Sequence, residues 1–133
     1  MTVTLAPAQE AYDFDHFRAL LADPSVLAES VAIRVFRAPL LAVAVGGPRR
    51  GGYFAASDLL IGLAVRNLLA GRYGFPDVRL RWSPCLDTCH GVQWGDAPPD
   101  SNDDRLRGEF YGYNKAAIDA FVRPAENRGL VTP

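Results

Sequence analysis

The sequence contains no run of about 18 apolar residues, the length that a helix needs to cross a membrane. Its opening segment, MTVTLAPAQE, also lacks the basic and apolar regions of a secretory signal. These absences predict a cytoplasmic protein with no membrane partner. Cysteine is scarce as well, with 2 residues in 133, and cytoplasmic thiols are reduced by default. A fold held together by several disulfides is therefore excluded.

Lysine and net charge are equally scarce. One lysine stands against thirteen arginines, which indicates a GC-rich genome, and the formal net charge is −1. The charges are unevenly distributed: residues 1–30 hold one arginine against five acids, whereas residues 31–83 hold eight arginines against two aspartates. Residues 84–133 hold five basic groups against eight acidic ones. The basic middle is either an anion-binding surface or is neutralised by termini that fold back over it.

The rest of the composition is typical of one globular domain. Hydrophobic residues make up 49% and charged residues 22%, and a chain of this length can bury a core of its own. We therefore expect residues 1–133 to form a single domain. Residues 1–8 and 125–133 lack a periodic pattern and are expected to be loose tails, and the polar, proline-containing stretch 96–108 is expected to be a mobile loop.

Helical periodicity marks three segments. The first begins after Asp13, a candidate N-cap. The second and clearest covers residues 57–70 and ends before Gly71, which suits the C-terminal glycine of a helix. Asn114 is placed to cap the third. The apolar residues expected on the buried faces of the first and third helices are Phe14, Phe17, Leu20, Leu21, Ile118, Phe121 and Val122.

Alternating apolar residues predict four or five strands. The segments are VAIRVFR, LLAVAV, YFAA, DVRLRWS and GVQWG. LLAVAV is apolar on both faces, so we expect it to be a central strand. The order of elements predicts an α+β fold: a mostly antiparallel sheet of four or five strands with the 57–70 helix packed on one face and the N- and C-terminal helices flanking it.

The stretch SPCLDTCHG holds both cysteines and one of the two histidines. Keeping the apolar residues of its flanking strands on one face predicts a hairpin with Trp82 opposite Val92 and Leu80 opposite Trp94. In that register Cys85 faces Cys89, beside the arginines, whereas His90 points toward the core.

Two thiols supply half of a tetrahedral zinc site, so neither a metal nor another cofactor is predicted. The spacing has one residue too many for the P-C-x-x-C half of a nucleobase deaminase or for C-x-x-C-H haem attachment. Nearby arginines would lower the pKa of a thiol. A thiol-dependent enzyme or redox protein that uses Cys85 and Cys89 is therefore the alternative function, and inert loop cysteines are the simpler interpretation.

The glycine-rich segment GGPRRGG, residues 46–52, could let the backbone approach an anion, but it lacks the lysine and spacing of a P-loop. A turn between strands explains it equally well. The alternation also predicts a set of arginines on the open sheet face and the adjoining loop. These candidate ligand-binding residues are Arg34, Arg49, Arg50, Arg79 and Arg81.

No acid, base and nucleophile converge in the pattern, which favours a small binding or regulatory domain over an enzyme. We expect it to engage an anionic small molecule or a protein partner through these arginines. The isoelectric point of about 6.1 makes nucleic acid a weaker candidate. A homo-oligomer, or a subunit of a larger assembly, is a further alternative.

Two segments of the sequence are distinctive. They are residues 44–90, AVGGPRRGGYFAASDLLIGLAVRNLLAGRYGFPDVRLRWSPCLDTCH, and residues 110–122, FYGYNKAAIDAFV. The chain resembles uncharacterised small proteins of Streptomyces-type actinobacteria. The resemblance implies no activity, cofactor or catalytic residue.

Overall fold

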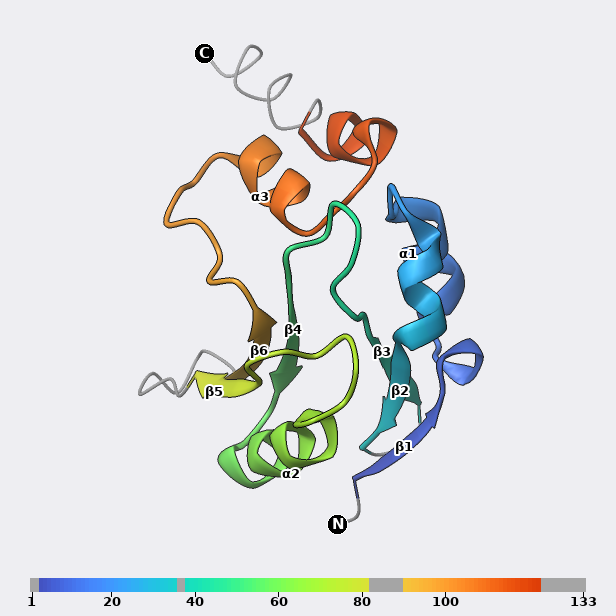
Figure 1. Ribbon diagram of the computed structural model, residues 1–133, viewed down its shortest axis with the longest axis vertical. Coiled ribbons are helices and arrows are strands. Elements are labelled where there is room, and N and C mark those ends of the chain that lie inside the picture. Colours follow the sequence, from blue (N-terminus) through green and yellow to red (C-terminus); the bar gives the residue numbers. More distant parts are fainter. Residues whose placement is uncertain (1–2, 36–37, 82–89, 123–133) are drawn as a thin grey trace, which may run out of the picture.

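The computed structural model describes residues 3–35, 38–81 and 90–122 (Figure 1). They form a small α+β unit with two antiparallel three-stranded sheets, ordered β1-β2-β3 and β4-β6-β5. The α+β class is confirmed, whereas the prediction of one sheet with four or five strands is wrong. The strands are β1 (Thr4–Pro7), β2 (Val31–Arg34), β3 (Pro39–Ala42), β4 (Gly51–Ala56), β5 (Arg79–Arg81) and β6 (His90–Gly95).

The helices lie at the two ends and along one side of this pair of sheets. In Figure 1, α2 lies at the lower end, α3 at the upper end and α1 beside the first sheet. A last helix starts at residue 115 and continues to residue 122, where the described part of the chain ends. The others are η1 (Ala8–Glu10), α1 (Phe14–Leu20), η2 (Pro24–Glu29), α2 (Leu59–Leu69) and α3 (Asp104–Phe110).

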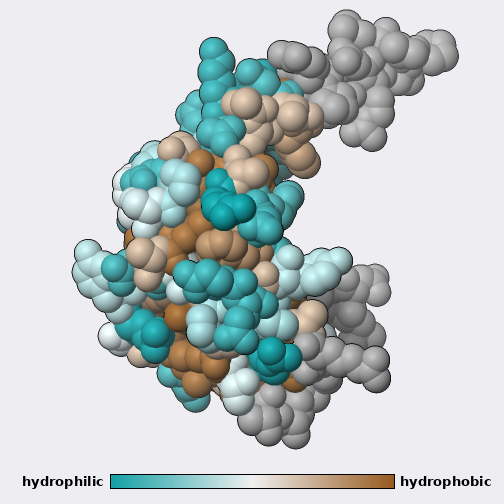
Figure 2. Space-filling view, turned by 90° about the vertical axis from the view of Figure 1, so that its right-hand side faces the viewer, coloured by the Kyte–Doolittle hydropathy of each residue, from teal (hydrophilic) through white to brown (hydrophobic). Residues whose placement is uncertain are grey.

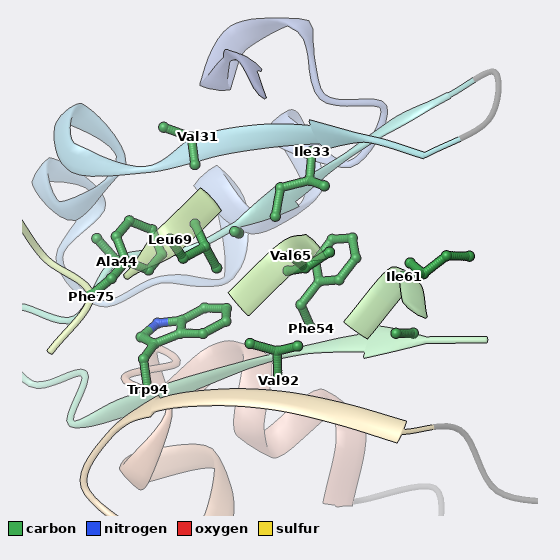
Figure 3. Close-up of a cluster of buried hydrophobic side chains, with 12 residues drawn as sticks. Val31, Ile33, Ala44, Phe54, Ile61, Val65, Leu69, Phe75, Val92 and Trp94 are labelled. Atoms are coloured by element: carbon green, nitrogen blue, oxygen red, sulfur yellow. The ribbon is translucent and has the colours of Figure 1, made fainter. Parts of the chain in front are cut away.

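Helix α2 forms where the sequence predicts a helix and packs on one face of the β4-β6-β5 sheet. Asp58 Oδ1 accepts a hydrogen bond from Ile61 N at 2.9 Å, and Gly71 after the helix has a φ of +82°. The buried face of α2 meets the apolar face of the sheet in the larger core cluster (Figure 3). Its central side chains are Phe54, Ile61, Val65, Leu69, Phe75, Val92 and Trp94.

Strand β3 is an edge strand, so the prediction of a central strand is wrong. The segment is apolar on both faces because it lies between two core clusters. Ala42 and Ala44 belong to the larger cluster, and Leu41 and Val43 to the smaller one. A strand is buried on both faces when a packed layer covers each face. It does not also need a hydrogen-bonded strand at each edge, so an edge strand can be apolar on both faces.

The free edge of β3 is covered by the chain just before α1. Asp13 Oδ1 accepts a hydrogen bond from Leu41 N at 2.8 Å, and Tyr12 N donates to Pro39 O at 2.8 Å. Asp13 occupies the predicted N-cap position of α1, and Phe17 N donates to its carbonyl at 3.1 Å, but its side chain makes no capping hydrogen bond to the helix. The carboxylate instead satisfies an edge amide that would otherwise be open to pairing with another strand.

Two regions predicted to be irregular are ordered. Residues 4–7 of the expected N-terminal tail form β1, which pairs with β2, and Ala8 is buried. The expected mobile loop ends early, because α3 begins at Asp104 with Asp103 as its N-cap. Acidic residues at that point are typical of a helix N-terminus, where they satisfy free amides and favour the helix dipole. The expected tail 125–133 lies outside the described residues.

The C-terminal helix forms as predicted. Asn114 Oδ1 accepts from Ala117 N at 2.7 Å, and Ile118 and Val122 are buried. Phe121, predicted on the same buried face, is 69% exposed. Apolar periodicity marks one side of a helix, but only the neighbouring elements decide how wide the covered stripe is.

The β5–β6 pair has the predicted faces in a different register. Leu80 lies opposite Val92, and Arg79 lies opposite Gln93, so the strands are shifted by two residues from the prediction. A shift of two leaves every side chain on its original face, so the hydrophobic pattern cannot detect it. Cys85, Cys89 and the side chain of His90 lie outside the described residues, and the thiol pair stays a prediction.

Candidate anion-binding site

The five predicted arginines do not share one surface. Arg34 lies on β2 in the first sheet, whereas Arg79 and Arg81 lie on β5 in the second, so the expectation of a single arginine face is wrong. Because the sequence pattern shows which face of its own strand a residue occupies, but not which sheet the strand joins, it could not separate these arginines.

Two of the arginines bind other groups of the chain itself. Arg79 donates from Nη1 to the carbonyls of Asp77 and Gly95 at 2.9 and 3.0 Å, which ties β5 to the end of β6. Arg50 forms an exposed ion pair with Asp96, with Nη2 2.9 Å from Oδ2. Arg81 is exposed.

Arg49 differs from the other four because it is buried, with 5% of its surface exposed. It closes the turn of the glycine-rich segment, where Gly46 and Arg49 exchange backbone hydrogen bonds of 2.9 and 3.1 Å. The turn packs against the end of α3, where Arg49 Nη1 donates to Tyr111 O at 2.9 Å and Arg50 N donates to Phe110 O at 2.9 Å. The segment predicted as an exposed loop therefore points one of its arginines inward.

The charge of Arg49 has no acidic partner among the described residues. The ion pairs of this part of the chain involve other arginines, and Arg49 Nε has no hydrogen-bond acceptor. Burial lowers the pKa of Arg49, and the nearby Tyr113, Tyr111 and Tyr53 act in the opposite direction. An arginine nevertheless stays protonated in a protein, so the site holds a buried positive charge.

Three tyrosines, Tyr53, Tyr111 and Tyr113, surround the guanidinium and are called the tyrosine cluster below. The rings of Tyr53 and Tyr111 meet edge to face with centroids 5.5 Å apart, and those of Tyr111 and Tyr113 are 6.2 Å apart. Arg49 Cζ lies 5.7 Å from the centroid of the Tyr111 ring, within reach of a cation–π contact. Burial raises the pKa of Tyr111 and of Tyr113, so both phenols are neutral near pH 7.

The elements that hold the tyrosine cluster are joined by backbone contacts. Tyr53 lies on β4, on the face away from α2, and Tyr111 is the C-cap of α3. Tyr113 pairs with Leu21 in an isolated bridge, and Asn114 N donates to Leu20 O at 2.7 Å, so the end of α1 is fixed against this segment.

Two cavities meet at the tyrosine cluster. The smaller, of about 180 Å³, is lined by Arg49 and Asp13 together with Phe17, Leu40 and other apolar residues. The larger, of about 430 Å³, lies between α1, α3 and the helix at 115–122. Tyr53 and Tyr113 line both cavities. Figure 2 views the molecule from the α1 side, where brown apolar surface is exposed in the centre and surrounded by teal polar residues.

The larger cavity combines an apolar wall with a polar rim. Leu20, Ala117 and Ile118 form much of the wall, while the exposed residues His16, Asp104 and Arg107 lie at the rim. Its volume falls in the range of about 300–1,000 Å³ that is usual for small-molecule sites, as does its mixture of apolar and aromatic lining with a few polar groups.

Sequence reasoning found Arg49 and missed the tyrosines. The alternation in FYGYN indicated two amphipathic rings close together, but nothing local connected them with Tyr53 or with the glycine-rich turn. In the described part of the chain, no group of three or more histidine, cysteine, aspartate or glutamate residues could hold a metal ion. No helix among these residues is long and apolar enough to cross a membrane.

Comparison with known proteins gives a family but no activity. No curated protein and no solved structure matches the chain. One family model, described as a family of unknown function, matches residues 5–132, which is almost the entire sequence. The chain therefore belongs to DUF6302, a family of unknown function.

Proposed function

We propose that this protein is a small binding domain whose ligand is an organic anion with an apolar body. The anionic group pairs with Arg49 at the smaller cavity, and the body lies in the larger cavity against the tyrosine cluster and Ile118. The observation that carries this proposal is the buried guanidinium of Arg49, which lines a cavity and has no acidic partner among the described residues.

The energetics of burial support an anionic ligand. Taking an arginine out of water costs several kcal/mol unless a counter-charge and hydrogen bonds replace the water. The Tyr111 carbonyl and the Tyr111 ring replace part of it. A carboxylate offers two acceptor oxygens that match the planar fork of a guanidinium.

The proposal keeps the predicted anionic ligand and narrows its site from five arginines to one. Arg50 and Arg79 are engaged by acidic or carbonyl groups of the chain itself. The cytoplasmic location, the actinobacterial origin, a regulatory role and a protein or nucleic-acid partner stay predictions from the sequence.

The test uses 3-phenylpropionate, a carboxylate with an apolar body, in isothermal titration calorimetry. We expect binding to the wild-type protein and at least about ten-fold weaker binding to Arg49→Met, which corresponds to about 1.4 kcal/mol. Arg50→Met is the matched control, because it removes an arginine from the same turn but leaves the site intact; its affinity should stay within about two-fold. Circular dichroism checks that each variant is folded. Equal affinity of wild type and Arg49→Met contradicts the proposal.

A second pair of variants tests where the apolar body lies. Ala117→Leu adds volume to the wall of the larger cavity, so we expect it to weaken binding of 3-phenylpropionate at least about five-fold. Ala116→Leu makes the same change at an exposed neighbouring position on the same helix and should have no effect. Equal effects of the two substitutions would place the body elsewhere.

A further inference from the structure

Asp13 places a carboxylate in the lining of the same smaller cavity as Arg49. Its Oδ1 accepts from Leu41 N at 2.8 Å, which fixes the side chain to the edge of β3. Among the described residues, Asp13 forms no ion pair, and Oδ2 has no hydrogen-bond partner. One cavity is thus lined by a positive and a negative group that do not pair with each other.

The presence of Asp13 bears on which anion can bind. A simple carboxylate that reaches Arg49 also comes close to the Asp13 carboxylate, and like charges that are partly shielded from water repel each other. A ligand that carries both charges avoids this repulsion. Its carboxylate meets the guanidinium and its ammonium group meets the free oxygen of Asp13, so both the buried charge of Arg49 and the half-buried charge of Asp13 gain a partner.

From this arrangement we infer that the ligand is a free α-amino acid with a large apolar side chain; this inference rests on the proposed function. The α-carboxylate pairs with Arg49 and the α-ammonium with Asp13. The smaller cavity, of about 180 Å³, takes these two groups, and the side chain extends past Tyr53 and Tyr113 into the larger one.

The lining of the larger cavity favours an aromatic side chain. Tyr53, Tyr111 and Tyr113 already meet one another edge to face or at a tilt, and a fourth ring can adopt the same geometry against them. Such contacts add about 0.5–1.5 kcal/mol beyond the burial of apolar area. Leu20 and Ile118 supply the apolar wall on the remaining sides.

The experiment compares three probes by isothermal titration calorimetry on the full chain. L-Phenylalanine carries both charged groups, 3-phenylpropionate lacks the ammonium and phenethylamine lacks the carboxylate. We expect L-phenylalanine to bind the wild-type protein at least about ten-fold more tightly than either of the others.

Asp13→Asn separates the role of the charge from the role of the side chain in the fold. An asparagine keeps an acceptor oxygen for Leu41 N, so the strand edge stays satisfied while the negative charge is lost. We expect this variant to bind L-phenylalanine at least about ten-fold more weakly and 3-phenylpropionate no more weakly than the wild type does. Asp15→Asn is the control, because it removes the same charge from an exposed position that pairs with Arg18.

The possible outcomes distinguish the two proposals. If 3-phenylpropionate binds as tightly as L-phenylalanine, or if Asp13→Asn changes neither affinity, the amino-acid inference is overturned and the anion site stands. If none of the three probes binds the wild-type protein, both are overturned.

Discussion

Gly112 allows the close contact that positions Arg49. Its φ is +73°, and a Cβ at this position would lie 2.6 Å from Arg49 Cβ and 2.8 Å from Arg49 N. The absence of a side chain lets the glycine-rich turn approach the end of α3, which brings the guanidinium to the Tyr111 carbonyl. The site therefore depends on a glycine that would not touch the ligand.

We expect Gly112→Ala to lower the free energy of unfolding by about 2–5 kcal/mol, measured by urea denaturation. A left-handed backbone costs a residue with a Cβ about 1–2 kcal/mol, and the clash with backbone atoms adds about 1–3. Gly71→Ala is the control, because Gly71 has a φ of +82° but nothing within 4 Å of the added Cβ. Its loss should be about 1–2 kcal/mol. Equal losses at the two positions would show that the contact with Arg49 does not matter.

The raised pKa of Tyr111 and of Tyr113 makes stability depend on pH in the alkaline range. Burial is the main cause for both, and the positive charge of Arg49 acts in the opposite direction. Between the usual tyrosine pKa of about 10 and the higher pKa of the folded state, the folded protein holds protons that the unfolded chain releases. The stabilisation is therefore complete below about pH 10 and is lost as the pH rises through the folded values.

Urea unfolding between pH 8 and 11 should show this loss, and Tyr111→Phe should make the decline less steep. Burial lowers the pKa of Arg49, but the guanidinium stays protonated over this pH range and does not offset the decline. Absorbance near 295 nm should detect fewer late-ionising phenols in Tyr111→Phe and in Tyr113→Phe than in the wild type. If the free energy of unfolding declines with pH as steeply in both variants as in the wild type, Tyr111 and Tyr113 are not the cause of the decline.

Helix α3 is too short to be stable by itself. Its 7 residues are fewer than the roughly 12–15 that an isolated helix needs, so caps and packing hold it in place. Asp103 Oδ1 accepts from Arg105 N and Leu106 N at 3.0 and 3.4 Å. The far end of the same helix carries Tyr111, which means that the cap supports the site through the helix.

We expect Asp103→Ala to lower the free energy of unfolding by about 1 kcal/mol and to weaken the binding of 3-phenylpropionate about two- to five-fold. Asp58→Ala is the matched control, since it removes the corresponding cap from α2 at the other end of the molecule (Figure 1). It should cost a similar amount of stability without changing the affinity. An equal loss of affinity in both variants would mean that general destabilisation, not the position of α3, is responsible.

At the scale of elements, local sequence signals determined which helices and strands could be predicted. Helix α2 has an N-cap, a C-terminal glycine and a clear apolar stripe, and all three were visible in advance. The apolar run of β3 was visible too, but its place at a sheet edge was not. An apolar pattern reports that both faces are covered, and it contains no information about which segments cover them.

A buried tryptophan of the second sheet connects the two sheets by a hydrogen bond. Trp94 Nε1 donates to Val43 O at 2.9 Å, just beyond β3, and its ring packs on Phe75 with centroids 5.1 Å apart. Figure 3 shows the indole between the strands of the first sheet and those of the second. Because the larger core cluster contains residues from both sheets, the described fold should unfold as one unit.

Trp94→Phe tests this connection. We expect it to lower the unfolding free energy by about 1–3 kcal/mol, because the Val43 carbonyl loses its buried donor. Tyr73→Phe, at a position that is 81% exposed, should have no effect. Hydrogen exchange should give the same opening free energy for the central amides of β2 and β6 in the wild type. Separate values for the two sheets would show that they unfold independently.

The sequence alone determined the class of the fold, α2 and its caps, the C-terminal helix, the faces of β5 and β6 and the candidacy of Arg49. These features depend on residues close together in the chain, whose periodicity and capping chemistry act locally. Only the tertiary structure decided that the strands form two sheets, that the β5–β6 register shifts by two residues and that Arg49 is buried among tyrosines. Asp13, Arg49, Tyr53 and Tyr111 are separated by up to a hundred positions and meet only when the core packs, which no local pattern records.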